Sequence, residues 1–192
     1  MNTKVLVFAG SARRDSLNKK LARLAASAAE RAGAEVTFID LSDYPMPIYH
    51  GDEEAATGIP ENGKKLKALF KSHQALIIAS PENNSSVSSL LKNTIDWLSR
   101  ADGSESGMAP FKDKTALLLA ASPGPFGGVR GLNHLRDIIS RLGVLTWPDM
   151  MTVGNADAAF DAAGGFVDGK QQARLEKLVA AMLQLSDARQ RN

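Results

Sequence analysis

Residues 5–18 constrain the fold of this chain more than any other stretch, because an apolar run leads directly into a polar turn and a helix. The run at residues 5–9 is short and continuously apolar, as is typical of a strand buried in a parallel sheet. After the turn, apolar residues recur with the helical period, at Leu17, Leu21, Leu24, Ala25 and Ala28. The stretch therefore predicts a strand, a tight turn and the start of a helix.

The turn itself has the composition of an anion site. Gly10 permits a sharp turn, and the first residues of a helix present unpaired backbone N–H groups. Hydroxyl, guanidinium and amide donors lie beside them, on Ser11, Arg13, Ser16 and Asn18. A purely structural interpretation stays open, because Ser16 or Asp15 also suits the N-cap position of a helix.

Two motifs that are absent narrow the kind of phosphate. The sequence has no Gly-x-Gly-x-x-Gly, so the glycines that admit a dinucleotide pyrophosphate are missing. It also has no Gly-Lys-Ser/Thr, which excludes a nucleoside-triphosphate loop. Hydroxyl groups in their place suit the terminal phosphate of a monoester.

The pattern Gly10-Ser11-x-Arg13-x-x-Ser16-x-Asn18 resembles the phosphate loop of the NADPH-dependent FMN reductase family. These are flavodoxin-like flavoenzymes that include chromate, quinone and azo-dye reductases. The resemblance implies FMN as cofactor, with its phosphate at this turn, and NADPH or NADH as electron donor. Arg13 is the strongest candidate ligand because its hydrogen bonds would be charge-assisted, whereas Arg14 is interpreted as a solvated neighbour.

Composition bounds the class of protein. With 192 residues, 44% of them hydrophobic, the chain can bury one sizeable core, and we expect a single domain over residues 1–192. The net charge is only +2, and Lys and Arg are spread along the sequence rather than gathered in a basic run. Neither nucleic acid nor a membrane is therefore a predicted partner. The chain has no cysteine, and its three histidines are far apart in sequence, so we expect no metal site. Residues 1–4 precede a strand rather than a signal region, which favours a cytoplasmic protein.

Strands and helices alternate along the rest of the chain. Apolar runs predict strands at residues 36–39, 75–79 and 115–121, and a fifth in residues 143–147 or 151–153. Amphipathic patterns predict helices at residues 61–72, about 87–100 and about 170–184. Proline and glycine predict an irregular loop at residues 41–60, either functional or a connector, and the tail at residues 186–192 is expected to fray.

A second polar turn, residues 80–86, follows the strand at residues 75–79. Read alone, its composition favours a capped loop. However, it resembles the same family's Pro-Glu-Tyr-Asn turn, and the next helix resembles that family's Leu-Lys-Asn-x-Ile-Asp-Trp segment. The resemblance implies contacts to the flavin ring edge and ribityl chain from Pro81, Glu82, Asn83, Asn84 and Ser86.

Two residues depart from the family pattern. Asn83 stands where the family usually has an aromatic residue, and Ser88 stands where it usually has a proline. Without the aromatic we expect a more open and more polar substrate side. In this family the following helix commonly packs against a partner subunit, so Ile95 and Trp97 are interpreted as partly interface and partly core.

A third turn, residues 122–130, follows the strand at residues 115–121 and is rich in glycine. Such residues let the backbone approach a planar ligand closely or adopt positive φ. The turn resembles the family's third flavin-side loop, and the resemblance implies contacts from Ser122, Gly124 and Gly127.

Taken together, these elements predict an α/β fold, a flavodoxin-like three-layer sandwich with a five-stranded parallel sheet of order 2-1-3-4-5. The resemblance implies an oxidoreductase that passes electrons from NADPH through FMN to a small acceptor by a ping-pong mechanism. Quinone, azo dye, metal ion and flavin are all candidate acceptors. It implies no catalytic side chain, because FMN carries the chemistry, and it implies a homodimer or homotetramer.

Three alternatives remain open at this point. A flavodoxin-type electron carrier is disfavoured by the near-neutral charge. A regulatory receiver-like module would need an aspartate at the end of the third strand, where the chain has Ala79 and Ser80. A serine hydrolase using Ser11 would need a histidine, and none is near it in sequence.

Overall fold

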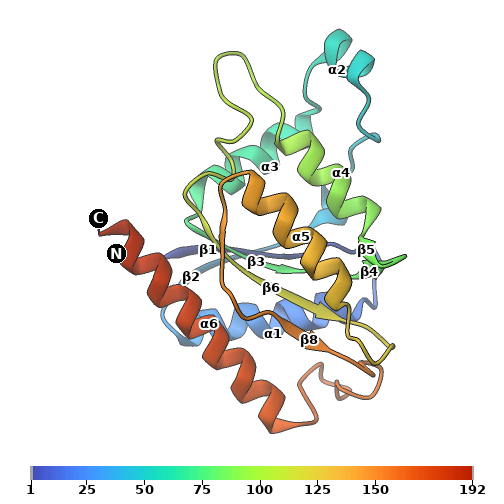
Figure 1. The fold of residues 1–192 in the computed structure, drawn as a ribbon, viewed down its shortest axis with the longest axis vertical. Helices are drawn as coiled ribbons and strands as arrows, with labels where there is room; N and C mark the ends of the chain where they lie inside the picture. Colours follow the sequence, from blue (N-terminus) through green and yellow to red (C-terminus); the bar gives the residue numbers. More distant parts are fainter. Residues whose placement is uncertain (1, 192) are drawn as a thin grey trace.

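In a computed structural model that describes residues 2–191, a parallel sheet of six strands runs through the molecule (Figure 1). In spatial order the strands are β2 (Glu35–Asp40), β1 (Lys4–Ala9), β3 (Ala75–Ala79) and β6 (Thr115–Ala121), with β7 (Leu145–Thr146) and β8 (Met151–Val153) both paired to β6. When β7 and β8 are counted as one interrupted strand, the order is the predicted 2-1-3-4-5. The predicted flavodoxin-like α/β fold is confirmed.

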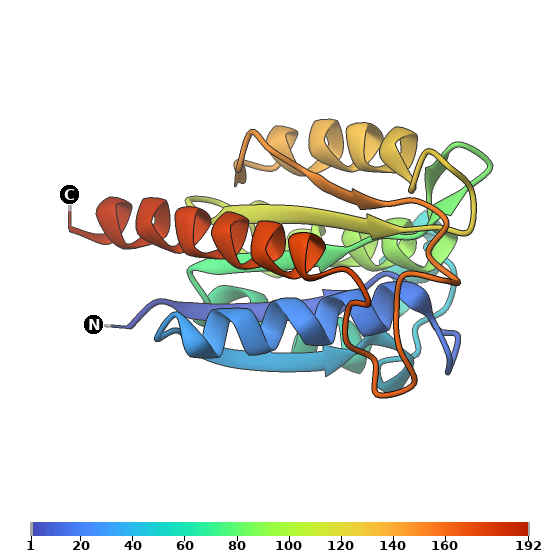
Figure 2. The same cartoon turned by 90° about the horizontal axis from the view of Figure 1, so that it is seen from below.

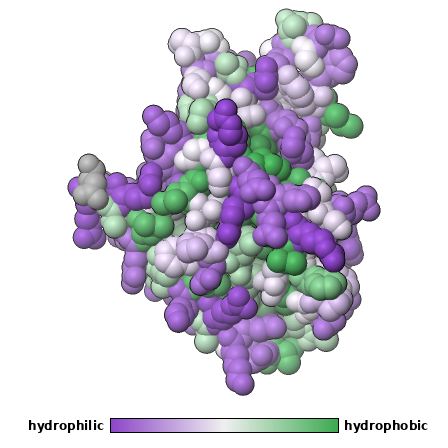
Figure 3. Space-filling model, viewed as in Figure 1, coloured by the Kyte–Doolittle hydropathy of each residue, from purple (hydrophilic) through white to green (hydrophobic). Residues whose placement is uncertain are grey.

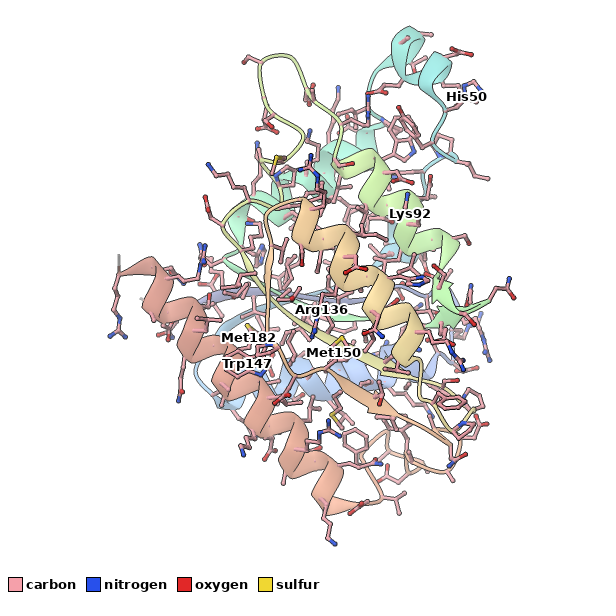
Figure 4. All side chains as sticks on the ribbon, in the orientation of Figure 1. His50, Lys92, Arg136, Trp147, Met150 and Met182 are labelled. Carbon is pink, nitrogen blue, oxygen red and sulfur yellow. The ribbon has the colours of Figure 1, made fainter. Side chains whose placement is uncertain are left out.

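The fifth strand is divided between the two candidate segments rather than formed by one of them. β7 pairs with the start of β6, and β8 pairs with its end. Pro148 lies between them and has no N–H to donate to a ladder. Arg136 of α5 (Val129–Arg141) binds the interrupted segment between β7 and β8. Its Nη2 donates to the carbonyl oxygens of Trp147 and Pro148 at 3.2 and 2.6 Å (Figure 4).

Helices cover both faces of the sheet. α1 (Leu17–Arg31) and α6 (Gly169–Gln190) contact each other on one face, while α3 (Glu61–Ser72), α4 (Ser89–Leu98) and α5 lie on the other (Figures 1 and 2). The strands divide their side chains between two cores: Val5 and Val7 pack with α1 and α6, whereas Leu6 and Phe8 pack with the other layer. β1, β3 and β6 are buried on both faces, which explains why these three strands are nearly continuous apolar runs.

A hairpin, which the sequence did not predict, shortens the helix expected at residues 87–100. β4 (Glu82–Asn83) and β5 (Ser86–Val87) pair antiparallel across a two-residue turn, so α4 begins at Ser89. Asn84 and Ser85 have φ values of 49° and 64°, the left-handed conformation that such tight turns require. An Asn-Ser pair lacks the glycine that usually identifies this turn.

Residues 41–60 are not wholly irregular, so that expectation was wrong in part. They contain a short 3-10 helix, η1 (Leu41–Asp43), and α2 (Gly51–Thr57). None of the residues of α2 is buried. Its sequence therefore has no apolar stripe from which a helix could be predicted. Its first turn carries Asp52, Glu53 and Glu54, and acidic residues stabilise a helix N-terminus.

Trp97 holds this segment against α4. Its Nε1 donates to the carbonyl oxygen of Pro47 at 2.8 Å, and Asn93 Nδ2 donates to the same oxygen at 2.9 Å. Trp97 is only 1% exposed, and Ile95 is also buried. Both side chains therefore belong to the core of this chain.

Helix α6 extends beyond its predicted end. It continues to Gln190, so the expectation of a frayed tail was wrong for residues 186–190, while Asn192 lies outside the described residues. Ser186 is buried, Thr3 donates to Asp187, and Gln190 Nε2 donates to Thr3 Oγ1 at 2.9 Å. These contacts fasten the end of the helix to the start of β1.

Replacing the buried Thr3 tests this fastening. We expect Thr3→Val to lower the free energy of unfolding by about 1–2 kcal/mol, because two hydrogen bonds are lost with little change of volume. Thr57→Val, at an exposed position of α2, should change it by less than about 0.5 kcal/mol. Urea unfolding measures both, and equal effects would show that the helix end is not docked.

The surface in Figure 3 is mainly hydrophilic, with apolar residues in small groups. Among residues 2–191, the most exposed large apolar side chain is that of Ile48, at 84%. Within residues 2–191, no helix is both long enough and apolar enough to cross a membrane.

Candidate functional site

A cavity of about 350 Å³ lies at the carboxyl ends of β1, β3 and β6. It is lined by the loops that follow these strands: loop 1 (residues 10–16), loop 2 (residues 80–88) and loop 3 (residues 122–128). In open α/β sheets this is the place where ligands bind.

Most of the predicted site residues meet in this cavity, although they come from three distant segments. Those in its lining are Ser11, Arg13, Ser16, Asn18, Pro81, Glu82, Asn83 and Ser122. Those outside its lining are Asn84, Ser86, Gly124 and Gly127. Lining residues that the sequence did not single out as site residues are Gly10, Ala12, Leu17, Ser88, Ser89, Leu90, Ala121 and Pro123.

Loop 1 combines a helix cap with an unpaired cation. Ser16 Oγ accepts a hydrogen bond from the Lys19 N–H at 3.4 Å and caps α1, so the structural interpretation of Ser16 holds. Ser11 Oγ accepts from the Arg13 N–H at 3.3 Å. The exposed Arg13 guanidinium has neither a hydrogen bond nor an ion pair to any described residue. Its donors are therefore available to a ligand.

Lys19 supports loop 1. The helical pattern of α1 places it away from the apolar face, where a solvent-exposed side chain is expected, but in the structure it is buried. It is 4% exposed, and its Nζ lies 2.6 Å from Asp40 Oδ2 at the end of β2. Ser42 extends the contact, because its Oγ donates to the Ala12 carbonyl oxygen at 3.4 Å. Burial raises the pKa of Asp40, but the hydrogen bonds from Lys19 and Ser42 outweigh it, so the pKa is lower than usual.

Lys19→Met should lower the free energy of unfolding by about 1–2 kcal/mol near neutral pH, because Asp40 loses its partner. Since the folded-state pKa of Asp40 is depressed, the stability that it contributes is present above its unfolded pKa. That contribution is lost as the pH falls through the folded-state value, below about pH 4. The difference from the wild type should therefore shrink between about pH 7 and pH 3 in urea unfolding.

Lys20→Met is the matched control for this experiment, because Lys20 has no ion pair to any described residue. It should show neither the loss of stability nor the pH dependence. A Lys19→Met difference that stays constant with pH would contradict the role assigned to Asp40.

Ser88 ties loop 1 to the start of α4. Its Oγ donates to the Gly10 carbonyl oxygen at 2.6 Å and accepts from the Leu91 N–H at 3.2 Å. A Cβ on Gly10 would lie 3.0 Å from the Leu91 Cβ, so this glycine serves close packing rather than a left-handed turn. A proline at position 88 could not make the bond to Gly10, because it has no hydroxyl.

The side chain of Glu82 has a structural role in loop 2. Its Oε2 accepts from the Gly131 N–H of α5 at 3.0 Å, and its Oε1 lies 3.6 Å from Arg130 Nη1. A carboxylate at a helix N-terminus is stabilising. Ser86 Oγ pairs instead with His134 Nδ1 at 3.0 Å, outside the cavity lining. Loop 2 therefore presents mainly its backbone and the Asn83 side chain to a ligand.

The glycines of loop 3 have unequal roles. Gly127 has a φ of 60°, and a Cβ there would lie 2.9 Å from the backbone nitrogen of Gly154. Gly124 is not in the left-handed region, and its Cβ would come no closer than 3.6 Å, to Ser122 Oγ. Gly127 therefore packs loop 3 against the end of β8, whereas Gly124 tolerates a side chain.

The electrostatics of the cavity suit a phosphate. The first turns of α1 and α4 both border it, and neither contains an acidic residue. Helix N-termini attract anions through their free N–H groups and their dipoles. Among the described residues that line the cavity, Glu82 is the one acidic residue, and its carboxylate already accepts a hydrogen bond from the Gly131 N–H of α5. With the unpaired Arg13, this donor set fits the terminal phosphate of FMN.

A serine hydrolase lacks its partners here. Each histidine has its hydrogen bond elsewhere: His50 with Asp52, His73 with Leu69, and His134 with Ser86. Figure 4 shows His50 at the start of α2, the helix within residues 41–60. Within the described part of the chain, no group of three or more metal-binding side chains could hold an ion.

Proteins of similar sequence identify the family. A sequence model of the family described as NADPH-dependent FMN reductase matches residues 3–158. The chain is 33% identical over 181 residues to an NAD(P)H-dependent FMN reductase from Pseudomonas aeruginosa, covering 93% of this chain and 92% of the relative. It is 31% identical over 169 residues to a 2-hydroxy-1,4-benzoquinone reductase from a Burkholderia species, covering 87% of each.

A solved structure agrees with this assignment. FerB, a flavoenzyme NAD(P)H:(acceptor) oxidoreductase from Paracoccus denitrificans, matches with a TM-score of 0.80 and 29% identity, covering 97% of this chain and 98% of FerB. The residues that the family model matches, 3–158, include all three loops that line the cavity. The chain is therefore a member of the NADPH-dependent FMN reductase family, and so an oxidoreductase that uses FMN and NAD(P)H.

Proposed function

We propose that the cavity binds FMN with its phosphate at loop 1 and its ring between loops 2 and 3. The observation that carries this proposal is the convergence of three loops at the carboxyl ends of neighbouring parallel strands, with an unpaired arginine among them. FMN, when bound, takes a hydride from a nicotinamide and passes electrons to an acceptor.

The residues of the chain bind and orient the cofactor. Arg13, Ser11 and the N–H groups at the start of α1 are the proposed phosphate ligands. The backbone of Pro81, Glu82 and Asn83, with Ser122, is proposed to contact the ring. The residues outside the cavity lining would support these loops rather than touch the ring: Asn84, Ser86, Gly124 and Gly127.

The acceptor is proposed to be a small molecule, and quinones come first because they are named for the Burkholderia relative. Asn83 is a small polar side chain and leaves its side of the cavity open to such a molecule. If the nicotinamide and the acceptor use this side in turn, initial rates should follow a ping-pong pattern, with parallel double-reciprocal lines. Azo dyes, metal ions and free flavin are the other acceptors to compare.

Reconstitution tests this function. The purified protein mixed with FMN should retain a yellow chromophore after gel filtration. NADPH or NADH should bleach it without oxygen, and a quinone should restore it. A protein that stays colourless would overturn the proposal. FMN retention without NAD(P)H oxidation would favour the electron-carrier alternative.

Self-association and cytoplasmic location are also part of the proposal. Ile48, which is 84% exposed, lies next to Pro47, the residue that Trp97 fastens to α4. This supports a homodimer or homotetramer that covers the α4 side. Light scattering during gel filtration would measure the assembly, and cell fractionation would test the location.

A further inference from the structure

Asn18 has both ends of its side-chain amide engaged by a single backbone residue. Its Nδ2 donates to the carbonyl oxygen of Ala121, and its Oδ1 accepts from the N–H of Ala121, each at 2.9 Å. Asn18 is only 3% exposed. Ala121 is the last residue of β6, directly before Ser122 of loop 3. The amide therefore joins the start of α1 to the point where loop 3 begins.

The position of this contact explains why an amide is needed. β3 pairs with β6 as far as Ala79, which lies opposite Leu119, and the Ser80 N–H then donates to Leu119 at 2.8 Å. In a parallel sheet every second residue directs its N–H and C=O to the same neighbour. Ala121 therefore directs both groups toward the place where β3 would continue. The Asn18 amide fills that place and offers one acceptor and one donor, as a peptide group would.

We propose that Asn18 is a positioning residue for loop 3 rather than a ligand of the FMN phosphate. It holds the backbone from which Ser122 enters the cavity, so a residue at the phosphate end of α1 shapes the side of the cavity assigned to the ring. This inference rests on FMN binding as proposed above. An aspartate would not replace it, because a carboxylate accepts from the Ala121 N–H but cannot donate to the carbonyl oxygen.

Comparing FMN with riboflavin separates the two roles, because riboflavin has the same ring and ribityl chain without the phosphate. The dissociation constants of both flavins are measured by fluorescence quenching with apoprotein. Asn18→Ala should raise both constants by the same factor, about tenfold, since a buried N–H loses its partner and loop 3 shifts. Ser11→Ala is the matched control from loop 1 and should raise the constant for FMN alone.

A second variant tests the hydrogen-bond pattern itself. In Asn18→Asp the ionised side chain lacks the donor, but the protonated side chain has one donor and one acceptor, as the amide has. Burial next to a carbonyl oxygen raises the pKa of such a carboxyl group. Between about pH 8 and pH 5, riboflavin binding and the thermal midpoint of the apoprotein should therefore recover toward wild-type values. Arg13 and Glu82, the other charged residues of the lining, are present in both proteins, so they do not account for a difference between the two.

The outcomes are distinct. If Asn18→Ala weakens FMN but not riboflavin, Asn18 is a phosphate ligand and the inference is overturned. The same follows if Asn18→Ala changes neither constant. It also follows if riboflavin binding and the thermal midpoint of Asn18→Asp have the same pH dependence as those of the wild type. Failure of the proposed function would appear instead as a wild-type protein that binds no FMN. In that case, or if Asn18→Ala does not fold, the thermal midpoint of the Asn18→Asp apoprotein, measured at about pH 8 and pH 5 beside the wild type, still decides whether the amide supports Ala121.

Discussion

Arg13→Met should weaken FMN binding by about 30- to 1,000-fold and leave riboflavin binding unchanged. The guanidinium is exposed and has no ion pair to a described residue, so its donors are free to meet a phosphate. Hydrogen bonds between charged partners contribute about 1.5–3 kcal/mol each, and a guanidinium can make two to one phosphate. Because solvent screens this exposed side chain, we expect a total of about 2–4 kcal/mol, which corresponds to the stated range of dissociation constants. Met keeps the apolar stem and removes only the charge and the donors.

The neighbouring Arg14 provides a matched control. It is also exposed and unpaired to any described residue, but it lies outside the cavity lining. Arg14→Met should change the dissociation constant by less than about twofold, because its charge is screened by solvent. Equal losses in the two variants would indicate a general effect of positive charge. A loss of riboflavin binding in Arg13→Met would indicate that loop 1 itself had been disturbed.

Gly127→Ala should lower the free energy of unfolding of the apoprotein by about 2–4 kcal/mol. Two costs combine at this residue. Its φ of 60° is unfavourable for alanine, and the new Cβ would lie 2.9 Å from both the Gly154 nitrogen and the Val153 carbonyl carbon. These atoms are backbone, so no rotamer change relieves the contact. Loop 3 or the end of β8 must move.

Gly124→Ala in the same loop is the control. The nearest neighbour of a Cβ there is the Ser122 Oγ at 3.6 Å, an ordinary contact, and φ is not positive. Its effect should stay within about 0.5 kcal/mol in urea unfolding followed by circular dichroism. If both variants lose the same stability, the distinction between the two glycines is wrong.

The sequence predicted the architecture well because the central strands β1, β3 and β6 are buried on both faces and are therefore apolar almost throughout. The strand at residues 75–79 and the helix at residues 61–72 have the predicted bounds. The interrupted fifth strand could not be resolved in advance, because both segments beside Pro148 have strand character and each pairs with a different part of β6. The hairpin before α4 was missed because left-handed Asn84 and Ser85 carry no glycine signal.

The cavity was predicted through its motifs, but the roles of individual side chains were not. The N-cap role of Ser16, whose partner Lys19 is three residues away, was one of the two alternatives left open by the sequence. Two other roles were not foreseen: Glu82 accepts a hydrogen bond from the first turn of α5, and Gly127 packs loop 3 against the end of β8. Both of these roles depend on neighbours that lie far away in the sequence. The support from Lys19 likewise depends on Asp40 at the end of another strand. Spacing identifies which residues gather, whereas their partners become known only from the fold.

The break between β7 and β8 has a consequence for association between molecules. An uninterrupted edge strand presents a row of N–H and C=O groups on which another chain can build a β-ladder, a common route to aggregation. Here Pro148 offers no N–H, and the neighbouring carbonyl oxygens already accept from Arg136. The break between β7 and β8 therefore protects this edge of the sheet against pairing with an added strand.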